Sequence, residues 1–94
     1  MKKCLVRIDN IERTLKKIPK HILINFSKWV EIIETFGLNE MKKTLGFHDE
    51  ALKGKRKGER SVRLSKSYRA IYRKVEEEEI IMIDVIKVSK HDYT

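Results

Sequence analysis

The chain has 94 residues, 40% of them hydrophobic, with one cysteine and a formal net charge of +8. This length predicts one domain over residues 1–94, and a lone cysteine excludes an internal disulfide and is typical of the reducing cytoplasm. No apolar run has signal-peptide length or approaches the about 18 residues of a membrane span. We therefore expect a cytoplasmic protein with no membrane partner.

The first part of the sequence predicts one strand and two helices. Cys4–Ile8 is short, apolar and β-branched, which indicates an edge strand. A short helix follows, capped by Asp9 or Asn10 and ended by Pro19, and a longer helix covers 20–36 and ends at a glycine. The short connection predicts an antiparallel helix pair. The apolar stripe of the longer helix consists of Ile22, Phe26, Trp29, Val30, Ile33 and Phe36.

The second part predicts a loop and then strands. Residues 38–45 indicate one weak helical turn, and 46–59 a loop. The strands expected after it cover 60–64, 68–75 and 80–88. The last is an almost continuous apolar run, which favours an interior strand packed on both faces. Helices followed by strands predict an α+β fold, with two N-terminal helices packed on a small, twisted, mostly antiparallel sheet.

The excess positive charge is confined to one segment. Residues 51–74 contain ten Lys or Arg and one acidic residue, which gives +9, so the rest of the chain sums to −1. Charge concentrated in this way favours a polyanionic partner, most often nucleic acid. The alternative is a solvated basic loop, which its own repulsion disfavours. The candidate phosphate contacts here are Lys53, Lys55, Arg56, Lys57, Arg60 and Arg63.

Two arginines in the strand 68–75 are candidate anion ligands. The period of two in a strand places Arg69 and Arg73 on one face, opposite the tyrosines. A planar guanidinium suits bidentate contact with a phosphate, including the pentacovalent phosphorus of a transition state. The structural alternative is an ion pair with Asp84 or Glu50.

Further candidates lie at the C-terminus and ahead of the basic segment. His91 titrates near neutral pH, Tyr93 can stack on a base, and Lys90 adds charge, unless these residues are only a polar tail. Glu50, beside many cations, is an ordinary surface acid or a general base. Scattered histidines and a lone cysteine argue against zinc, and the sequence has no Walker-type glycine loop, so we expect no cofactor.

Four segments in register resemble the RelE/ParE superfamily of type II toxins, in particular its RelE, YoeB and HigB branches. These segments are 50–54, 58–64, 68–72 and 88–93. The resemblance implies the same α+β fold and an endoribonuclease that cleaves mRNA in the ribosomal A site without a metal. In that reaction a 2′-hydroxyl attacks the adjacent phosphate and leaves a 2′,3′-cyclic phosphate and a 5′-hydroxyl.

The resemblance also implies roles for individual residues. Arg69 matches the arginine that stabilises the phosphorane, and Lys53 and Arg63 match basic positions around the scissile phosphate. Glu50 falls where the YoeB-like branch has its carboxylate base. His91 matches an acid, and Tyr93 a residue that positions or stacks on a base.

The C-terminal order departs from both nearest branches. YoeB-like proteins have His-Tyr adjacent and HigB-like proteins end in Asp-Tyr-His, whereas here Asp92 separates His91 from Tyr93. Either Glu50 or His91 is therefore the general base. The resemblance further implies an acidic antitoxin partner. Two alternatives stay open: a ParE-like gyrase inhibitor and a non-catalytic RNA- or ribosome-binding module.

Overall fold

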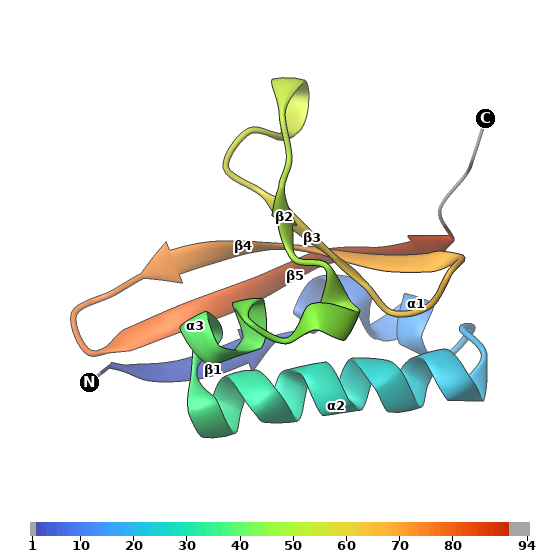
Figure 1. The fold of residues 1–94 in the computed structure, drawn as a ribbon, viewed down its shortest axis with the longest axis horizontal. Coiled ribbons are helices and arrows are strands. Elements are labelled where there is room, and N and C mark those ends of the chain that lie inside the picture. Colours follow the sequence, from blue (N-terminus) through green and yellow to red (C-terminus); the bar gives the residue numbers. More distant parts are fainter. Residues whose placement is uncertain (1, 91–94) are drawn as a thin grey trace.

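A five-stranded sheet with helices packed on one face forms the body of the computed structural model, which describes residues 2–90 (Figure 1). The strands are β1 (Lys3–Arg7), β2 (Glu50–Ala51), β3 (Arg60–Arg63), β4 (Tyr68–Glu76) and β5 (Ile80–Lys90). Their order is β1-β5-β4-β3-β2. β1 pairs parallel with β5, and the other pairings are antiparallel. The expected α+β class, the mostly antiparallel sheet and the edge position of the first strand are confirmed.

The helical segments match the prediction at α2 and depart from it before α2. They are η1 (Asp9–Ile11), α1 (Glu12–Leu15), α2 (Lys20–Phe36), α3 (Leu38–Lys42), η2 (Leu45–Phe47) and η3 (Gly54–Arg56). α2 has the predicted bounds and ends at Gly37, whose φ is 94°. α1 is a single turn, too short for the expected antiparallel helix pair. Neither Asp9 nor Asn10 caps it, because the Asn10 amide instead donates to Asp84 Oδ1 at 3.3 Å.

The hydrophobic core lies between α2 and the sheet. The buried side chains of α2 are Ile22, Phe26, Trp29 and Ile33, as the apolar stripe predicted. Trp29 packs on the ring of Tyr72 in β4, with 5.4 Å between ring centroids. Phe36 was expected in the stripe but is 66% exposed. The chain reverses at Gly37 directly after it, and Leu38 and Met41 of α3 are buried in the core instead.

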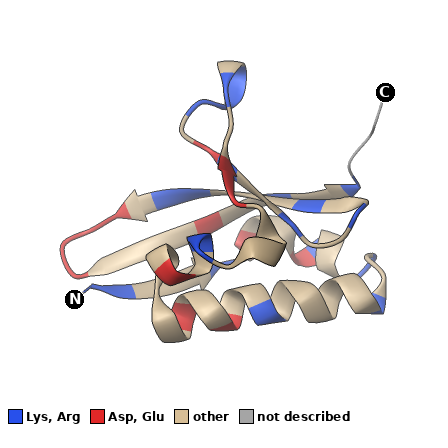
Figure 2. Cartoon of the chain, in the orientation of Figure 1, with Lys and Arg blue, Asp and Glu red and all other residues tan. Residues whose placement is uncertain are grey.

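The segment 46–59, predicted as a loop, contains a short strand. β2 pairs with β3, so residues 52–59 form the tip of a β-hairpin and not a free loop. A hydrogen bond from the Leu52 N–H to the Glu59 carbonyl closes the base of this tip at 2.9 Å. We call residues 52–59 the basic arm. Figure 1 shows it standing away from the sheet, and Figure 2 shows its Lys and Arg residues around η3.

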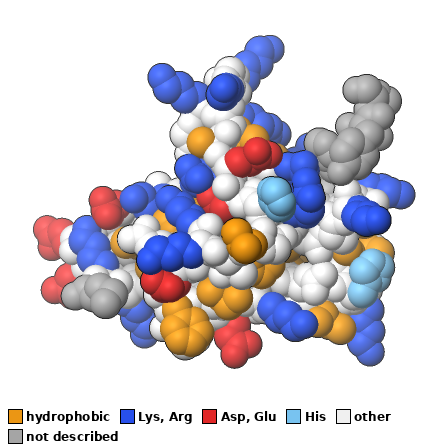
Figure 3. All heavy atoms as spheres, viewed as in Figure 1, with side chains coloured by type: hydrophobic (Ala, Val, Ile, Leu, Met, Phe, Trp, Pro, Cys, Tyr) orange, Lys and Arg blue, Asp and Glu red, His pale blue; other side chains and the backbone are white. Residues whose placement is uncertain are grey.

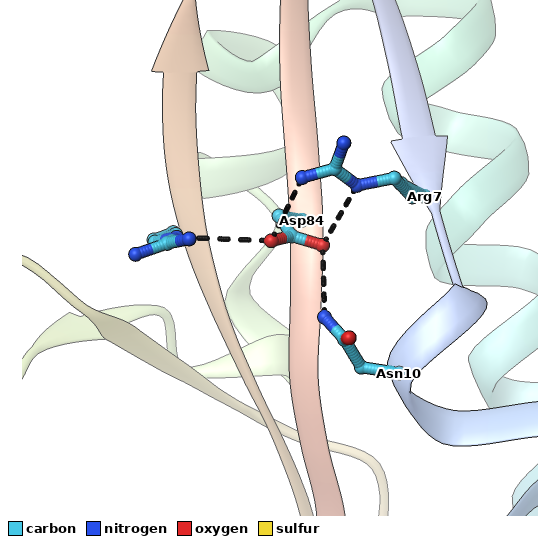
Figure 4. Close-up of polar contacts among 4 residues, drawn as sticks. Arg7, Asn10 and Asp84 are labelled. Atoms are coloured by element: carbon cyan, nitrogen blue, oxygen red, sulfur yellow. Dashed lines mark hydrogen bonds and ion pairs between the residues drawn. The ribbon is translucent and has the colours of Figure 1, made fainter.

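A buried carboxylate ties β5 to its neighbours on the face of the sheet opposite α2. Arg7 of β1 donates to Asp84 through Nε at 3.1 Å and pairs with it through Nη2 at 3.1 Å, and Arg73 of β4 lies 3.7 Å away (Figure 4). The hydrogen bond from Arg7 and the two positive charges lower the pKa of Asp84, although burial opposes this. β5 is thus interior as expected, but its outer face is held by charge and not by apolar packing.

Among residues 2–90, no helix has the length and apolar character required to cross a lipid bilayer.

Candidate active site

An open hollow of about 340 Å³ lies on the outer face of the sheet, the face opposite α2, at the base of the basic arm. The side chains of Glu50, Ser61 and Ile71 meet there because these residues are register partners on β2, β3 and β4. We call it the Glu50 hollow. Its lining consists of Glu50, Leu52, Arg56, Ser61, Arg69, Ile71, Ser89 and Lys90.

A guanidinium and a carboxylate are in contact in this hollow. Arg69 Nη1 donates to Glu50 Oε1 at 3.1 Å and to Ser61 Oγ at 3.2 Å. The Arg69 side chain is only 20% exposed, whereas Glu50 is 60% exposed. The hollow therefore presents an oriented cation beside a carboxylate that water and ligands reach. Both ion pairs considered from the sequence are present, because Arg69 pairs with Glu50 and Arg73 pairs with Asp84.

Arg63 lies next to Arg69 on the same face. The two are register partners on β3 and β4. The Arg63 Nε is buried and has no hydrogen-bond partner among the described residues. Since an arginine donates from every guanidinium nitrogen, this unused N–H leaves the site short of an acceptor.

A second carboxylate, Asp49, anchors the chain directly ahead of Glu50. Its side chain is 1% exposed and accepts from Arg60 Nε at 2.6 Å and from the Tyr72 hydroxyl. Burial and the negative Asp49 both raise the pKa of Tyr72. Burial lowers the pKa of Arg60, but its hydrogen bond to Asp49 and the charge of Asp49 outweigh that effect and raise it. Asp49 thus fixes the start of β2 and, with it, the place of Glu50.

The other basic candidates fall in three places. Lys53, Lys55 and Lys57 are exposed on the basic arm, where Figure 3 shows positive side chains projecting from the tip. Arg56 reaches the Glu50 hollow but also pairs with Glu59 at 2.7 Å. Arg60 is paired with Asp49, and its register partners Ala51 and Tyr72 place it on the opposite face of the hairpin.

Lys90 lines the Glu50 hollow, whereas Arg73 pairs with Asp84 at 3.7 Å. His91 and Tyr93 lie outside the described residues. Sequence reasoning missed Ser61, Ser89 and Asp49. Their signals were weak: outward positions in two strands, and an Asp-Glu pair in which only one carboxylate can share a face with Arg69. Within residues 2–90, no three His, Cys, Asp or Glu side chains gather as a metal site.

Comparison with solved structures identifies the fold. No family model matches the sequence, and no curated protein matches it. The YoeB/ParE toxin from Agrobacterium tumefaciens superposes with a TM-score of 0.65 at 17% identity, over 96% of this chain and 99% of that one. The RelBE2 toxin–antitoxin complex from Mycobacterium tuberculosis gives 0.61 at 19% identity, over 96% and 98%. The YoeB–YefM complex from Staphylococcus aureus gives 0.58 at 18% identity, over 99% of both chains. The chain has the fold of the RelE- and YoeB-like toxins.

Proposed function

We propose that the chain is the toxin of a type II toxin–antitoxin system and cleaves mRNA in the ribosomal A site. The observation that carries this proposal is the contact between Glu50 and Arg69 in an open hollow at the base of the basic arm. A carboxylate and an oriented guanidinium are the two groups that a phosphodiester transesterification needs. The fold shared with toxins supports the proposal without carrying it.

In the proposed reaction, Glu50 accepts the proton of a ribose 2′-hydroxyl. The 2′-oxygen forms a bond to the adjacent phosphorus while the bond to the 5′-oxygen breaks, which gives a 2′,3′-cyclic phosphate and a 5′-hydroxyl. Arg69 and Arg63 stabilise the negative charge that gathers on the phosphorane. A positioned base contributes about 10²–10⁴ in rate. His91 is the proposed acid that protonates the 5′-oxygen, or the base in place of Glu50.

The basic arm and the ribosome supply positioning. Lys53, Lys55 and Lys57 are exposed and form no ion pair within residues 2–90, so they can contact phosphates. Holding the reacting hydroxyl in line with the phosphate contributes several kcal/mol of the about 7–11 kcal/mol available from orientation. A hollow this shallow gains that orientation from the surrounding ribosome. The reaction proposed here uses the chain's own side chains, takes place in the cytoplasm and needs no metal.

The proposed partner is an acidic antitoxin. A chain whose +9 segment binds RNA harms its own cell unless that segment is covered. A partly disordered acidic segment that lies over the basic arm and the Glu50 hollow satisfies both the charge and the shape. One of the similar structures, from Mycobacterium tuberculosis, is itself a toxin–antitoxin complex, and the one from Staphylococcus aureus is a complex of YoeB with YefM.

Induced expression in a bacterium with mapping of mRNA 5′ ends tests the proposal. We expect the wild type to stop growth and to produce cuts within translated frames. Arg69→Ala removes the phosphorane contact and should abolish the cuts, and His91→Ala should reduce them strongly. Lys57→Ala, on the arm, should mainly weaken affinity and reduce its salt dependence.

Other outcomes separate the alternatives. Growth arrest with intact mRNA would favour a ParE-like inhibitor of gyrase. Binding to ribosomes without cuts or arrest would favour a non-catalytic module. Equal losses from Arg69→Ala and Lys57→Ala would contradict the division between reacting and steering residues.

A further inference from the structure

A second hollow, of about 290 Å³, lies on the opposite face of the β2–β3 hairpin. Ala51 and Arg60, which line it, are register partners that point away from Glu50 and Ser61. Three cations from α3, β3 and β4 meet there: Lys42, Arg60 and Lys74. We call it the Lys42 hollow. The remaining lining residues are Leu38, Gly58, Ala51 and Glu59.

The carboxylates near this hollow already have their own partners. Glu59, the acidic residue of the described lining, pairs with Arg56 at 2.7 Å. Asp49 is buried and pairs with Arg60 at 2.5 Å. Each negative charge is therefore matched by one arginine, and neither has a second cation as its ion-pair partner.

Lys42 and Lys74 are left without a counterion. Neither forms an ion pair within residues 2–90, although both face the same hollow as Arg60. Burial and the positive charges of Arg60 and Lys74 lower the pKa of Lys42, and the negative charge of Asp49 offsets this in part. Cations that repel one another around an open space are stabilised when an anion enters it.

We propose that the Lys42 hollow binds a phosphate group of RNA, separate from the bond that is cut in the Glu50 hollow. The identification of RNA as the source rests on the proposed function, whereas the preference for an anion rests on the unpaired Lys42 and Lys74 beside Arg60. A volume of about 290 Å³ holds a phosphate group with several waters, since a water takes about 30 Å³. Lysine ammonium groups suit this as compact, strongly attracting donors.

The position of the basic arm links the two hollows. The two hollows lie on the two faces of the β2–β3 hairpin. The arm is the tip of this hairpin and stands away from the sheet (Figure 1). An RNA strand that crosses the arm passes Lys53, Lys55 and Lys57 on its way from one hollow to the other. The Lys42 hollow therefore holds the strand at a distance from the reacting phosphate and favours longer RNA over short fragments.

The test measures binding of a 2′-O-methylated single-stranded RNA, which cannot be cleaved, by fluorescence anisotropy over a series of salt concentrations. Lys42→Gln with Lys74→Gln removes the two unpaired charges. Lys16→Gln with Lys17→Gln is the matched control, since both lysines are exposed and unpaired within residues 2–90. We expect the first pair to weaken binding about fivefold to tenfold and to lower the salt slope by about 0.7, the value of one phosphate contact. The control should change neither quantity appreciably.

Several results would overturn the inference. Equal weakening by both double variants would mean that only the overall charge of the protein matters. If the wild type showed no measurable RNA binding, the Lys42 hollow would not be an RNA phosphate site. A second measurement follows the Nζ signals of Lys42 and Lys74 by NMR. Signals that shift with inorganic phosphate but not with RNA would make the hollow a site for the free anion.

This experiment is independent of cleavage. Selective weakening by Lys42→Gln with Lys74→Gln in a chain that cuts no mRNA would disprove the proposed function and leave the phosphate site standing. If the wild type cleaves mRNA but Lys42→Gln with Lys74→Gln weakens RNA binding no more than the control does, the phosphate site is disproved and the proposed function stands.

Discussion

At the scale of single residues, two adjacent carboxylates do opposite things. Asp49 is buried with Tyr72 and Arg60, whereas Glu50 is exposed beside Arg69. The alternation of a strand separates them to two faces, so that one carboxylate anchors the chain and the other is exposed to water and ligands beside Arg69. We infer that the place of Glu50 depends on the hydrogen bond between Asp49 and Tyr72.

Tyr72→Phe tests this dependence. The ring and its packing on Trp29 remain, but buried Asp49 loses one hydrogen bond, which should cost about 1–2 kcal/mol of unfolding free energy. We expect cleavage to lose kcat with little change in KM, and we expect no additional loss in a Glu50→Gln background. An equal loss in both backgrounds would show that Tyr72 acts on stability alone.

Tyr68→Phe is the matched control for that change. Tyr68 begins β4, is partly exposed, and its hydroxyl has no hydrogen-bond partner within the described residues. Denaturant unfolding and cleavage of Tyr68→Phe should both match the wild type. A comparable loss there would mean that any tyrosine change in β4 disturbs the site.

At the scale of elements, the junction between α2 and α3 determines what covers the sheet. Gly37 has a φ of 94° and a ψ of 166°, which lets the chain reverse so that Leu38 and Met41 enter the core. Phe36 is left exposed by the same reversal. Lys42, at the end of α3, reaches its hollow only because α3 starts in this direction.

Gly37→Ala should therefore destabilise the fold by about 1–3 kcal/mol, since an L-residue is strained in that region. Space is not the cause, because an added Cβ meets nothing within 4 Å. Gly46→Ala is the control: it has equal space and no positive φ, and should change stability by less than about 1 kcal/mol. The two midpoints of urea unfolding compare them directly, and equal midpoints would contradict the argument.

At the scale of the whole molecule, the parallel β1–β5 pair joins the N-terminal strand to the last strand. Arg7 of β1, Asn10 of η1 and Arg73 of β4 all contact Asp84 of β5 and so hold that junction together (Figure 4). A carboxylate with a lowered pKa stabilises the fold above its unfolded value of about 3.9. That stabilisation is lost as the pH falls through the lower pKa of the folded state.

Stability should accordingly fall in acid below about pH 4, and Asp84→Asn should flatten that fall. Glu78→Gln, in the β4–β5 hairpin loop, is the control, since it removes one carboxylate that has no ion pair within residues 2–90. Thermal unfolding from pH 2 to 7 measures both. An unchanged acid dependence in Asp84→Asn would show that other carboxylates control it.

The sequence predicted the parts whose signal is local. α2 follows from its apolar spacing and its terminal glycine, and β4 and β5 follow from strand patterns, with ends one to two residues longer. β2 was missed because two residues carry no period, and it exists only through pairing with β3. Asn10 was predicted as a cap, but a carboxylate 74 positions away binds it instead.

The candidate site divides in the same way. Glu50, Arg69 and Lys90 line one hollow. The sequence identified each of them as a candidate, but it placed Glu50 in a loop and Lys90 after the last predicted strand, so it did not predict that they meet. The separation of Arg60 and Arg73 from them depends on Asp49 and Asp84, whose burial no local pattern shows. The Lys42 hollow joins three elements distant in sequence, so charge counting over 51–74 did not predict it.

The measurement that tests the central claim most directly is the chemistry of the RNA ends. Purified wild type and Glu50→Gln are added to ribosomes programmed with a defined mRNA, and the fragments are examined for their terminal groups. We predict a 2′,3′-cyclic phosphate and a 5′-hydroxyl with the wild type, and a rate lower by about 10²–10⁴ with Glu50→Gln if Glu50 is the base. Intact mRNA, or fragments with a 5′-phosphate, would contradict the account.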